Sequence, residues 1–217
     1  MPRALQTTTS EWDQISLDGV EIKKHIVISR KMKFKSLDAF ETWLVQHIAD
    51  RIAVARERLI LARLDGNAPE GGSVVANAGI DAANIKTNVE YSDAGIRSIM
   101  ALIKGQGSRT IYANSTTIWS GLVGIEDGKG EKLFVPDSMG DPIVQGRIYG
   151  AVVKLDENLA DNAAYFGIPK KLLVNDYTGT EIFRSMDPKT AAEIILGYTL
   201  VDAALENPKS FVKATFT

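Results

Sequence analysis

The strongest constraint in this sequence is a long strand pattern that runs directly into a long helix pattern. From Val20 to Lys35, even positions are mostly apolar and odd positions are mostly charged or polar. Such alternation with a period of two predicts a β-strand that buries one face. Lys24, Val27 and Arg30 break the alternation, which predicts a bend or bulge midway. Fully extended, this segment would reach roughly 50 Å at about 3.3 Å per residue.

A helix is predicted directly after this strand, from Asp38 to Leu64. Asp38 is a favourable N-cap, and Glu41 follows it at the spacing of a capping box. Gly66 is placed to end the helix as a C′ residue. The apolar stripe at helical spacing comprises Phe40, Trp43, Leu44, Ile48, Ile52, Ala55, Leu59 and Ile60.

The lengths of these two elements constrain the shape of the molecule. About 27 helical residues span roughly 40 Å. A compact globule of 217 residues would have a diameter of roughly 44 Å. A strand and a helix that each reach about that far predict an elongated, plate-like molecule, and plates are suited to tiling.

The remaining sequence predicts shorter elements, so the fold class is mixed α+β without an internal repeat. Residues 67–88 are rich in Gly, Ala and Asn, which predicts a loop. A second helix is predicted over 93–104 behind the cap Ser92, and a third begins at Ser115, the expected cap of that helix. Strands are predicted at 110–113, 132–135, 148–155, 171–177 and 181–185, the last two joined by a turn at Thr178-Gly179, and two more lie between 191 and 216 around a turn at 206–208.

Composition and charge exclude several classes of protein. Hydrophobic residues make up 45% and charged residues 24%, as in a soluble globular protein of one large domain or two small ones. A formal net charge of −2 argues against a broad basic surface that holds nucleic acid. The absence of cysteine excludes disulfides, a thiolate nucleophile and cysteine-based zinc sites. Because no apolar run approaches the roughly 20 residues of a membrane span and the start lacks a signal-peptide core, we expect a cytosolic origin and no membrane partner.

Sequence motifs for catalysis are missing as well. The two histidines, His25 and His47, are isolated, and neither belongs to a pair with metal-ligand spacing. No Gly-x-Ser-x-Gly elbow is present, and the glycines from Gly124 to Gly130 lack the spacing of a phosphate-binding loop. We therefore expect no catalytic residues, no cofactor and no metal. A small hydrolase that uses carboxylates from the 126–141 loops stays as an alternative, because carboxylates near glycine turns form such sites in other proteins.

Basic residues on the two long elements are the candidate contacts with other molecules. On the strand they lie on the predicted polar face, and on the helix they lie mostly off the apolar stripe. A solvated surface is the default interpretation for both sets, and lysines also protect strand edges. The alternative is that they meet acidic groups of a neighbouring copy or packaged nucleic acid. The candidate subunit-interface residues are Lys23, Lys31, Lys33, Lys35, Arg51, Arg56, Arg58 and Arg63.

The order of the segments resembles that of HK97-type major capsid proteins of tailed bacteriophages and prophages. The stretch VEIKKHIVISRKMKFKSLDAFETWLVQHIADRIAVARERLILARLDGNAPEGG resembles the part of that family where the extended loop returns to the body and enters the long spine helix. SIMALIKGQGSRTIYANSTTIWSGLVGIEDGKGEKLFV is similar to the family's axial domain, YFGIPKKLLVNDYTGTEIF to its glycine-containing strand hairpin, and YTLVDAALENPKSFVKATF to its closing strands. Each motif is weak alone, and their shared order carries the resemblance.

This resemblance implies an HK97-like fold with a spine helix, a peripheral domain and an axial domain. The peripheral domain would comprise residues 12–90 plus 191–217, and the axial domain residues 91–190. Compared with the family, the sequence lacks the N-terminal arm and most of the extended loop. Because those parts wrap neighbouring subunits in the family, we expect this chain to assemble poorly by itself. No lysine–asparagine cross-link is assigned.

The function implied by the resemblance is that of a major capsid protein, a structural subunit and not an enzyme. Its copies would self-assemble into pentamers and hexamers of an icosahedral virion shell that encloses double-stranded DNA without sequence-specific contacts. A scaffolding protein and a maturation protease are further partners that the family implies, and assembly would take place in the cytoplasm of a bacterial host. Two alternatives stay open: an encapsulin-like nanocompartment shell, which shares the fold, and a decoration or adaptor module, which a fold without the spine helix would favour.

Overall fold

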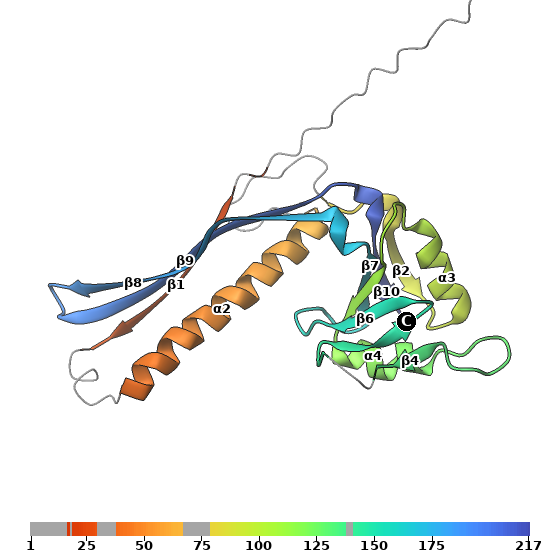
Figure 1. The fold of residues 1–217 in the computed structure, drawn as a ribbon, viewed down its shortest axis with the longest axis horizontal. Coiled ribbons are helices and arrows are strands. Elements are labelled where there is room, and N and C mark those ends of the chain that lie inside the picture. The colour runs from red at the N-terminus through yellow and green to blue at the C-terminus, as the bar shows by residue number, and fades with distance from the viewer. Residues whose placement is uncertain (1–16, 18, 30–37, 67–78, 138–140) are drawn as a thin grey trace, which may run out of the picture.

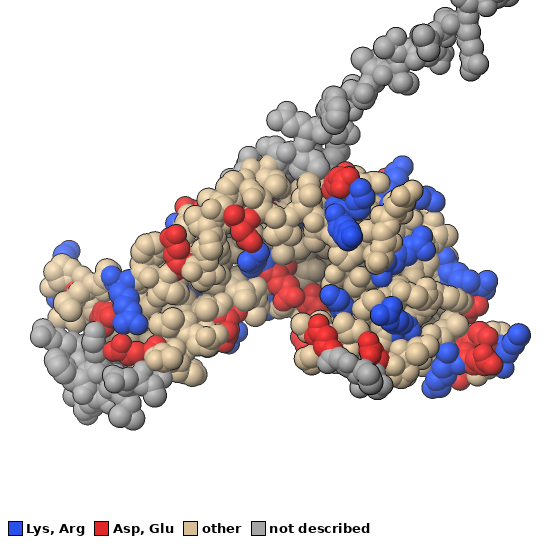
Figure 2. All heavy atoms as spheres, viewed as in Figure 1, with Lys and Arg blue, Asp and Glu red and all other residues tan. Residues whose placement is uncertain are grey.

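The computed structural model describes residues 17, 19–29, 38–66, 79–137 and 141–217. They form two lobes, each built around its own β-sheet, which lie end to end in an elongated molecule (Figure 1). Basic and acidic side chains are interspersed over both lobes (Figure 2). The extended lobe consists of strands β1 (Val20–Ile28), β8 (Leu172–Asp187) and β9 (Ala192–Leu205) and helix α2 (Asp38–Leu64). The compact lobe contains the other helices and strands.

Three antiparallel strands in the order β1-β9-β8 form the sheet of the extended lobe. One face of this sheet packs against α2, and Ile22, Ile26 and Ile28 of β1 lie on that face. Ile28 of β1 and Ile195 of β9 join Leu44, Ile48 and Ile52 of α2 in one buried cluster. Burial of one face, as predicted for the first strand, is therefore confirmed over the described residues of β1, whereas the predicted bulge midway is wrong there, because the register against β9 runs without a shift.

Helix α2 ends at Leu64 as predicted and begins at Asp38, the residue that was predicted as its N-cap. Gly66 follows it with a φ of 72°, the left-handed conformation expected of a C′ glycine. Most of the predicted apolar stripe faces the sheet, but Trp43 is 56% exposed and stacks between Phe40 and His47 on the helix surface. Its predicted place on the buried stripe is wrong, because it lies about 100° around the helix from Leu44. The narrow sheet does not cover that flank.

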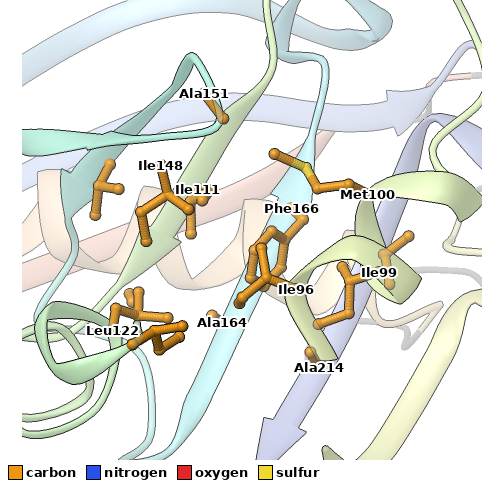
Figure 3. Close-up of a cluster of buried hydrophobic side chains, with 14 of the residues drawn as sticks. Ile96, Ile99, Met100, Ile111, Leu122, Ile148, Ala151, Ala164, Phe166 and Ala214 are labelled. Carbon is orange, nitrogen blue, oxygen red and sulfur yellow. The ribbon is translucent and has the colours of Figure 1, made fainter. Parts of the chain in front are cut away.

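A mixed seven-stranded sheet in the order β2-β10-β7-β3-β6-β5-β4 forms the compact lobe. Helices α3 and α4 supply isoleucines that join Ile111 and Phe166 of the sheet in the main core (Figure 3). Tyr112 and Tyr165 lie on the opposite face and pack toward the base of the extended lobe. The bounds are β2 (Ile85–Val89), β3 (Thr110–Ala113), β4 (Phe134–Pro136), β5 (Val144–Ile148), β6 (Ala151–Leu155), β7 (Ala163–Gly167), β10 (Phe211–Phe216), α3 (Asp93–Leu102) and α4 (Ser115–Ser120).

Two strand predictions for the compact lobe are wrong. The end of the predicted loop 67–88 lies in β2, which pairs in parallel with β10 at the edge of the sheet. Residues 148–155, predicted as one strand, contain the turn of the β5–β6 hairpin. Tyr149 and Gly150 both have a positive φ, 50° and 77°, which reverses the chain there in the manner of a tight hairpin turn.

The start of α4 also differs from the prediction. Ser115 is the first residue of the helix, and Asn114 before it is the N-cap. The Asn114 side-chain oxygen accepts the backbone N–H of Thr117 at 2.8 Å. Asn is as good an N-cap as Ser, so the local sequence offered both.

Strand β8 replaces the hairpin that was predicted around Thr178-Gly179. It continues for 16 residues through that dipeptide. Its register against β9 shifts between Asp176 and Glu181, so an irregularity within one strand takes the place of the predicted turn. The chain reverses only after Asp187, whose carboxylate accepts the backbone N–H of Lys189 at 2.9 Å.

The division of the strands between the two sheets does not coincide with the predicted domain boundaries. The predicted axial domain, 91–190, includes β8, which pairs with β9 in the extended lobe. The predicted peripheral domain, 12–90 plus 191–217, includes β2 and β10, which belong to the seven-stranded sheet. Because the strands of one sheet share one core, sheet membership favours an axial unit built from β2 to β7 and β10. The division into these two domains stays a prediction.

Candidate assembly surface

The extended lobe is held together at its base by a buried ion pair. Arg63, in the last turn of α2, is 2% exposed, and Asp202 of β9 is 0% exposed. The Arg63 guanidinium donates from Nε and Nη2 to the two Asp202 carboxylate oxygens, at 2.8 and 3.2 Å. Such a bidentate pair fixes the helix against the strand. The predicted exposure of Arg63 is therefore wrong, because its charge is neutralised by a partner 139 residues away in the sequence.

The face of the three-stranded sheet that points away from α2 carries exposed apolar side chains. The strand register places Val27 of β1 opposite Ile194, and Phe183 of β8 opposite Leu196. Val27 is 57% exposed and Phe183 is 49% exposed. We call these four residues the outer face. Apolar side chains exposed side by side on a thin sheet mark an interaction surface.

Both edges of this sheet are unpaired within the described residues. Strands β1 and β8 each pair with β9 alone, so the N–H and C=O groups along their outer sides have no strand partner there. Strand β8 presents such an edge over 16 residues. A long edge strand is a template for another chain.

Besides Arg63, two more of the predicted basic residues form ion pairs within the chain. Lys23 pairs with Glu21 and lies over the Tyr198 ring, 5.7 Å from its centroid. Arg56 pairs with Asp176 of β8 and so braces α2 against the sheet. Such solvent-exposed pairs contribute little to stability, because water and salt screen their charges.

The other predicted basic residues divide into described and undescribed ones. Arg51 and Arg58 are exposed on α2, as predicted. Arg58 Nε donates to the Asn158 Oδ1 of the compact lobe at 3.4 Å. Lys31, Lys33 and Lys35 lie outside the described residues. The role of these residues at a subunit interface stays a prediction.

A groove of about 310 Å³ lies where α2 meets the compact lobe. Apolar residues line most of it, together with two carboxylates, Glu57 of α2 and Asp156 of the compact lobe. Figure 2 shows acidic side chains at this junction. The side-chain amide of Asn158 donates to Glu57, and its backbone N–H donates to Asp156 at 2.9 Å. We call this feature the junction groove.

The two carboxylates of the junction groove are less acidic than usual. Burial and the nearby Asp156 carboxylate raise the pKa of Glu57. Burial also raises the pKa of Asp156. Among the described residues, neither carboxylate forms an ion pair. The described residues therefore compensate the negative charge at this junction incompletely.

A carboxylate directly after α2 also ties the helix to the compact lobe. Tyr165 of β7 donates its hydroxyl to Asp65 Oδ1 at 2.6 Å. Lys213 of β10 donates to Asp65 Oδ2 at 2.8 Å. The pKa of Tyr165 is raised, mainly by burial and next by the hydrogen bond to Asp65, so the phenol stays protonated at neutral pH. These contacts set where the two lobes join.

Two carboxylates of the 126–141 loops, those of Asp127 and Asp141, accept hydrogen bonds within turns. Asp127 Oδ1 accepts the backbone N–H groups of Lys129 and Glu131, at 2.8 and 2.9 Å. Asp141 Oδ1 accepts the N–H of Ile143 at 3.0 Å.

In the part of the chain that the structure describes, no cluster of three or more His, Asp or Glu residues is placed to hold a metal. No described helix has both the length and the hydropathy to cross a bilayer. The hydrolase alternative gains no support from these contacts.

A protein-family model matches nearly the whole chain. The family is described as the phage capsid family, and the match covers residues 3–216. This chain belongs to the phage capsid family. Its predicted function as a capsid shell protein is thereby confirmed. A comparison with curated proteins gave no match.

Solved structures with the same fold include phage capsids and an encapsulin. The capsid of an empty GTA particle gives a TM-score of 0.70 at 15% identity and covers 100% of this chain and 81% of that chain. A Mycobacterium phage Che8 structure gives 0.62 at 17% identity, covering 99% and 80%. The SrpI encapsulin complex from Synechococcus elongatus gives 0.61 at 7% identity, covering 91% and 73%. At such identities the likeness shows the fold alone, and the predicted HK97-like α+β fold of this capsid protein is confirmed.

Sequence patterns directed attention to basic residues and missed the apolar outer face of this capsid protein. Val27 was the one local signal, since it is an apolar residue at a polar position of the alternation. Phe183 gave none, because Ile182 beside it is also apolar. Only the strand register shows that Val27 and Phe183 share a face.

Proposed function

We propose that this capsid protein assembles into pentamers and hexamers of an icosahedral shell, with its extended lobe laid against neighbouring copies. The observation that carries the proposal is the exposed outer face, with Val27 and Phe183 on a lobe whose two sheet edges are unpaired within the described residues. Each Å² of apolar surface buried in a contact contributes about 25 cal/mol. The GTA capsid, which has the same fold, was computed with five-fold symmetry, and this supports ring-shaped assembly.

The geometry of the extended lobe supports rings of copies. Edges β1 and β8 are on opposite sides of one sheet, so a contact through both is heterologous, each copy using different surfaces toward its two neighbours. Heterologous contacts close into rings when the rotation between copies divides a full turn. Two-sided contact of this kind is what pentamers and hexamers require.

The proposed shell encloses double-stranded DNA and is part of a virion that assembles in the bacterial cytoplasm. The net charge of −2 is consistent with enclosure, because tight binding along DNA would require a broad basic surface. A scaffolding protein and a maturation protease are the proposed further partners. The proposed role is structural and not enzymatic.

An encapsulin-like shell is the second candidate, and the likeness to the Synechococcus elongatus encapsulin favours it. The two candidates differ in what the particle contains. Particles purified from the bacterial host after nuclease treatment should retain protected DNA if the shell is a capsid. Particles that hold protein cargo and no nucleic acid would favour the encapsulin-like function.

The test of assembly is electron microscopy and light scattering over a range of protein concentrations. We expect rings or closed particles at the highest concentrations. A double variant, Val27→Asp with Phe183→Asp, should raise the concentration needed for assembly at least tenfold, because it places charge on the outer face. Thr180→Asp with Ser108→Asp adds the same two negative charges at exposed positions without removing an apolar side chain, and it should assemble like the wild type. A chain that stays monomeric at its solubility limit would contradict the proposal.

A further inference from the structure

The junction groove has the chemistry of an acceptor for a basic, partly apolar segment. Its walls are largely apolar, with Ile60 and Leu61 of α2 on one side and Tyr165 on the other. Glu57 and Asp156 supply two carboxylates, and Lys154 is the one basic residue among the described lining. Long basic side chains suit such a site, since their alkyl stems pack on apolar walls while their charged ends reach carboxylates.

One segment of this sequence matches that chemistry closely. Residues 30–35 read Arg-Lys-Met-Lys-Phe-Lys, which is four basic residues and two apolar ones. It is the densest run of positive charge in the chain. The raised pKa values of Glu57 and Asp156 indicate that a cation brought to the groove would relieve the cost of their charge.

The segment of one copy is held far from the junction groove of the same copy. Residues 29–37 connect the end of β1 to the start of α2, and Ile28 packs against Leu44 in the first turns of that helix. Glu57 lies about 28 Å from the start of the helix and about 20 Å beyond Leu44, at 1.5 Å per residue. The backbone between Ile28 and Asp38 would have to be fully stretched along the helix to come within a side chain's length of Glu57. A segment from a second copy can lie in the groove without that stretch, so the match between the two favours a contact between copies.

We propose that the junction groove receives the basic segment Arg30–Lys35 of a second copy of this chain, with lysine and arginine ends at Glu57 and Asp156 and with Met32 and Phe34 on the apolar walls. The inference rests on the proposed function, because it assigns a contact between neighbouring copies. It also gives the predicted interface residues Lys31, Lys33 and Lys35 a partner. Charge-assisted hydrogen bonds of this kind fix register between copies as well as adding affinity.

A charge-swap experiment tests the contact. Glu57→Lys and the double variant Lys31→Glu with Lys33→Glu should each raise the concentration for half-assembly at least tenfold. Combined in one chain, these substitutions should restore at least half of the wild-type particle yield, because every groove then meets a segment of opposite charge. Glu57 is exposed at the rim of the groove, so its substitution leaves the core intact.

The matched controls carry the same changes of net charge at exposed positions in the compact lobe. Glu131→Lys is the control for the groove variant, and Lys129→Glu with Lys132→Glu is the control for the segment variant. Both should assemble like the wild type. Equal losses in the controls, or normal assembly of the Glu57→Lys chain, would overturn the contact while leaving the shell function standing.

A peptide experiment separates this contact from assembly itself. A fluorescently labelled synthetic peptide of residues 29–36 is titrated with the unassembled chain, and its anisotropy is followed. We expect binding to the wild type, at least tenfold weaker binding to Glu57→Lys, and no change for Glu131→Lys. Binding without any particle formation would retain the groove contact and reject the shell. Absent binding, or equal binding to the Glu57→Lys chain, would reject the groove contact.

Discussion

The two lobes bury their strands to very different degrees. In the compact lobe, every residue of β7 is buried, between β3 and β10 and under the helices. In the extended lobe, β8 is more than three times as long, and none of its 16 residues is buried. The compact lobe therefore obtains its core from its own elements. In the part of the chain that the structure describes, the extended lobe is one sheet on one helix, and no other element covers its second face.

Among the substitutions that test this difference between the lobes, we expect the largest loss of stability from one in the core of the compact lobe. Phe166→Ala removes a ring that is 0% exposed and that packs near Phe216, with ring centroids 6.3 Å apart. We expect a loss of about 3–5 kcal/mol in the free energy of unfolding, measured by urea denaturation of the unassembled chain. Hydrogen exchange should show the loss mainly in the compact lobe. An equal loss of protection in β1 and β9 would show that the two lobes unfold as one unit.

The buried ion pair tests what holds the extended lobe. Arg63→Ala leaves the Asp202 carboxylate buried without its cation, and we expect a loss of about 3 kcal/mol in the free energy of unfolding. The pair Arg63→Met with Asp202→Leu replaces both charges by apolar groups and should recover most of that loss. Thermal and urea denaturation measure both. A cost below about 1 kcal/mol for Arg63→Ala would mean that packing alone holds the lobe.

Close packing of the sheet on α2 gives a smaller effect. A Cβ added at Gly197 would overlap Ile48 and Ile52, so Gly197→Ala should cost about 1–3 kcal/mol. Gly179→Ala is the matched control in β8, where an added Cβ meets nothing within 4 Å, and its cost should stay within about 0.5 kcal/mol. Urea denaturation again provides the measurement. Equal costs at the two positions would contradict a tightly packed helix–sheet contact.

The smallest expected effect concerns the junction between the lobes. Because the pKa of Glu57 is raised in the folded chain above its ordinary value of 4.5, the folded state holds this proton more tightly than the unfolded state. The resulting penalty is present at neutral pH and disappears as the pH falls below the ordinary value. Glu57→Gln should therefore raise the melting temperature by about 1–2 °C at pH 7 and leave it unchanged near pH 4. Glu131→Gln should show no such difference between the two pH values, and a pH-independent shift in Glu57→Gln would contradict this origin.

Local signals explain which elements were predictable from the sequence. Helix α2 was predicted at both ends because its caps and its apolar spacing are encoded within a few residues of each other. Strand β2 was missed because Ile85 to Val89 form a strand only by pairing with β10, more than a hundred residues later. Strand β7 was missed because Ala163 to Gly167 are buried on both faces and show no alternation.

The candidate surfaces were less predictable than the fold, for the same reason. Arg63 looked like a surface cation because its partner Asp202 lies in a distant strand. Glu57 and Asp156 come together only when α2 packs against the compact lobe. No spacing within either segment signals such a meeting. The charge pattern of one segment shows which charged side chains could form contacts with other molecules. Tertiary packing then decides which of those side chains stay exposed.

The tie at Asp65 makes α2 a lever with its pivot at the compact lobe. The helix is about 40 Å long, so a tilt of about 5° at its C-terminal end displaces its first turn by about 3.5 Å. Tyr165 and Lys213 hold that pivot through two hydrogen bonds to one side chain. Because Arg63 and Asp202 join α2 to its sheet, any small rotation at this pivot would be magnified at the far end of the whole extended lobe.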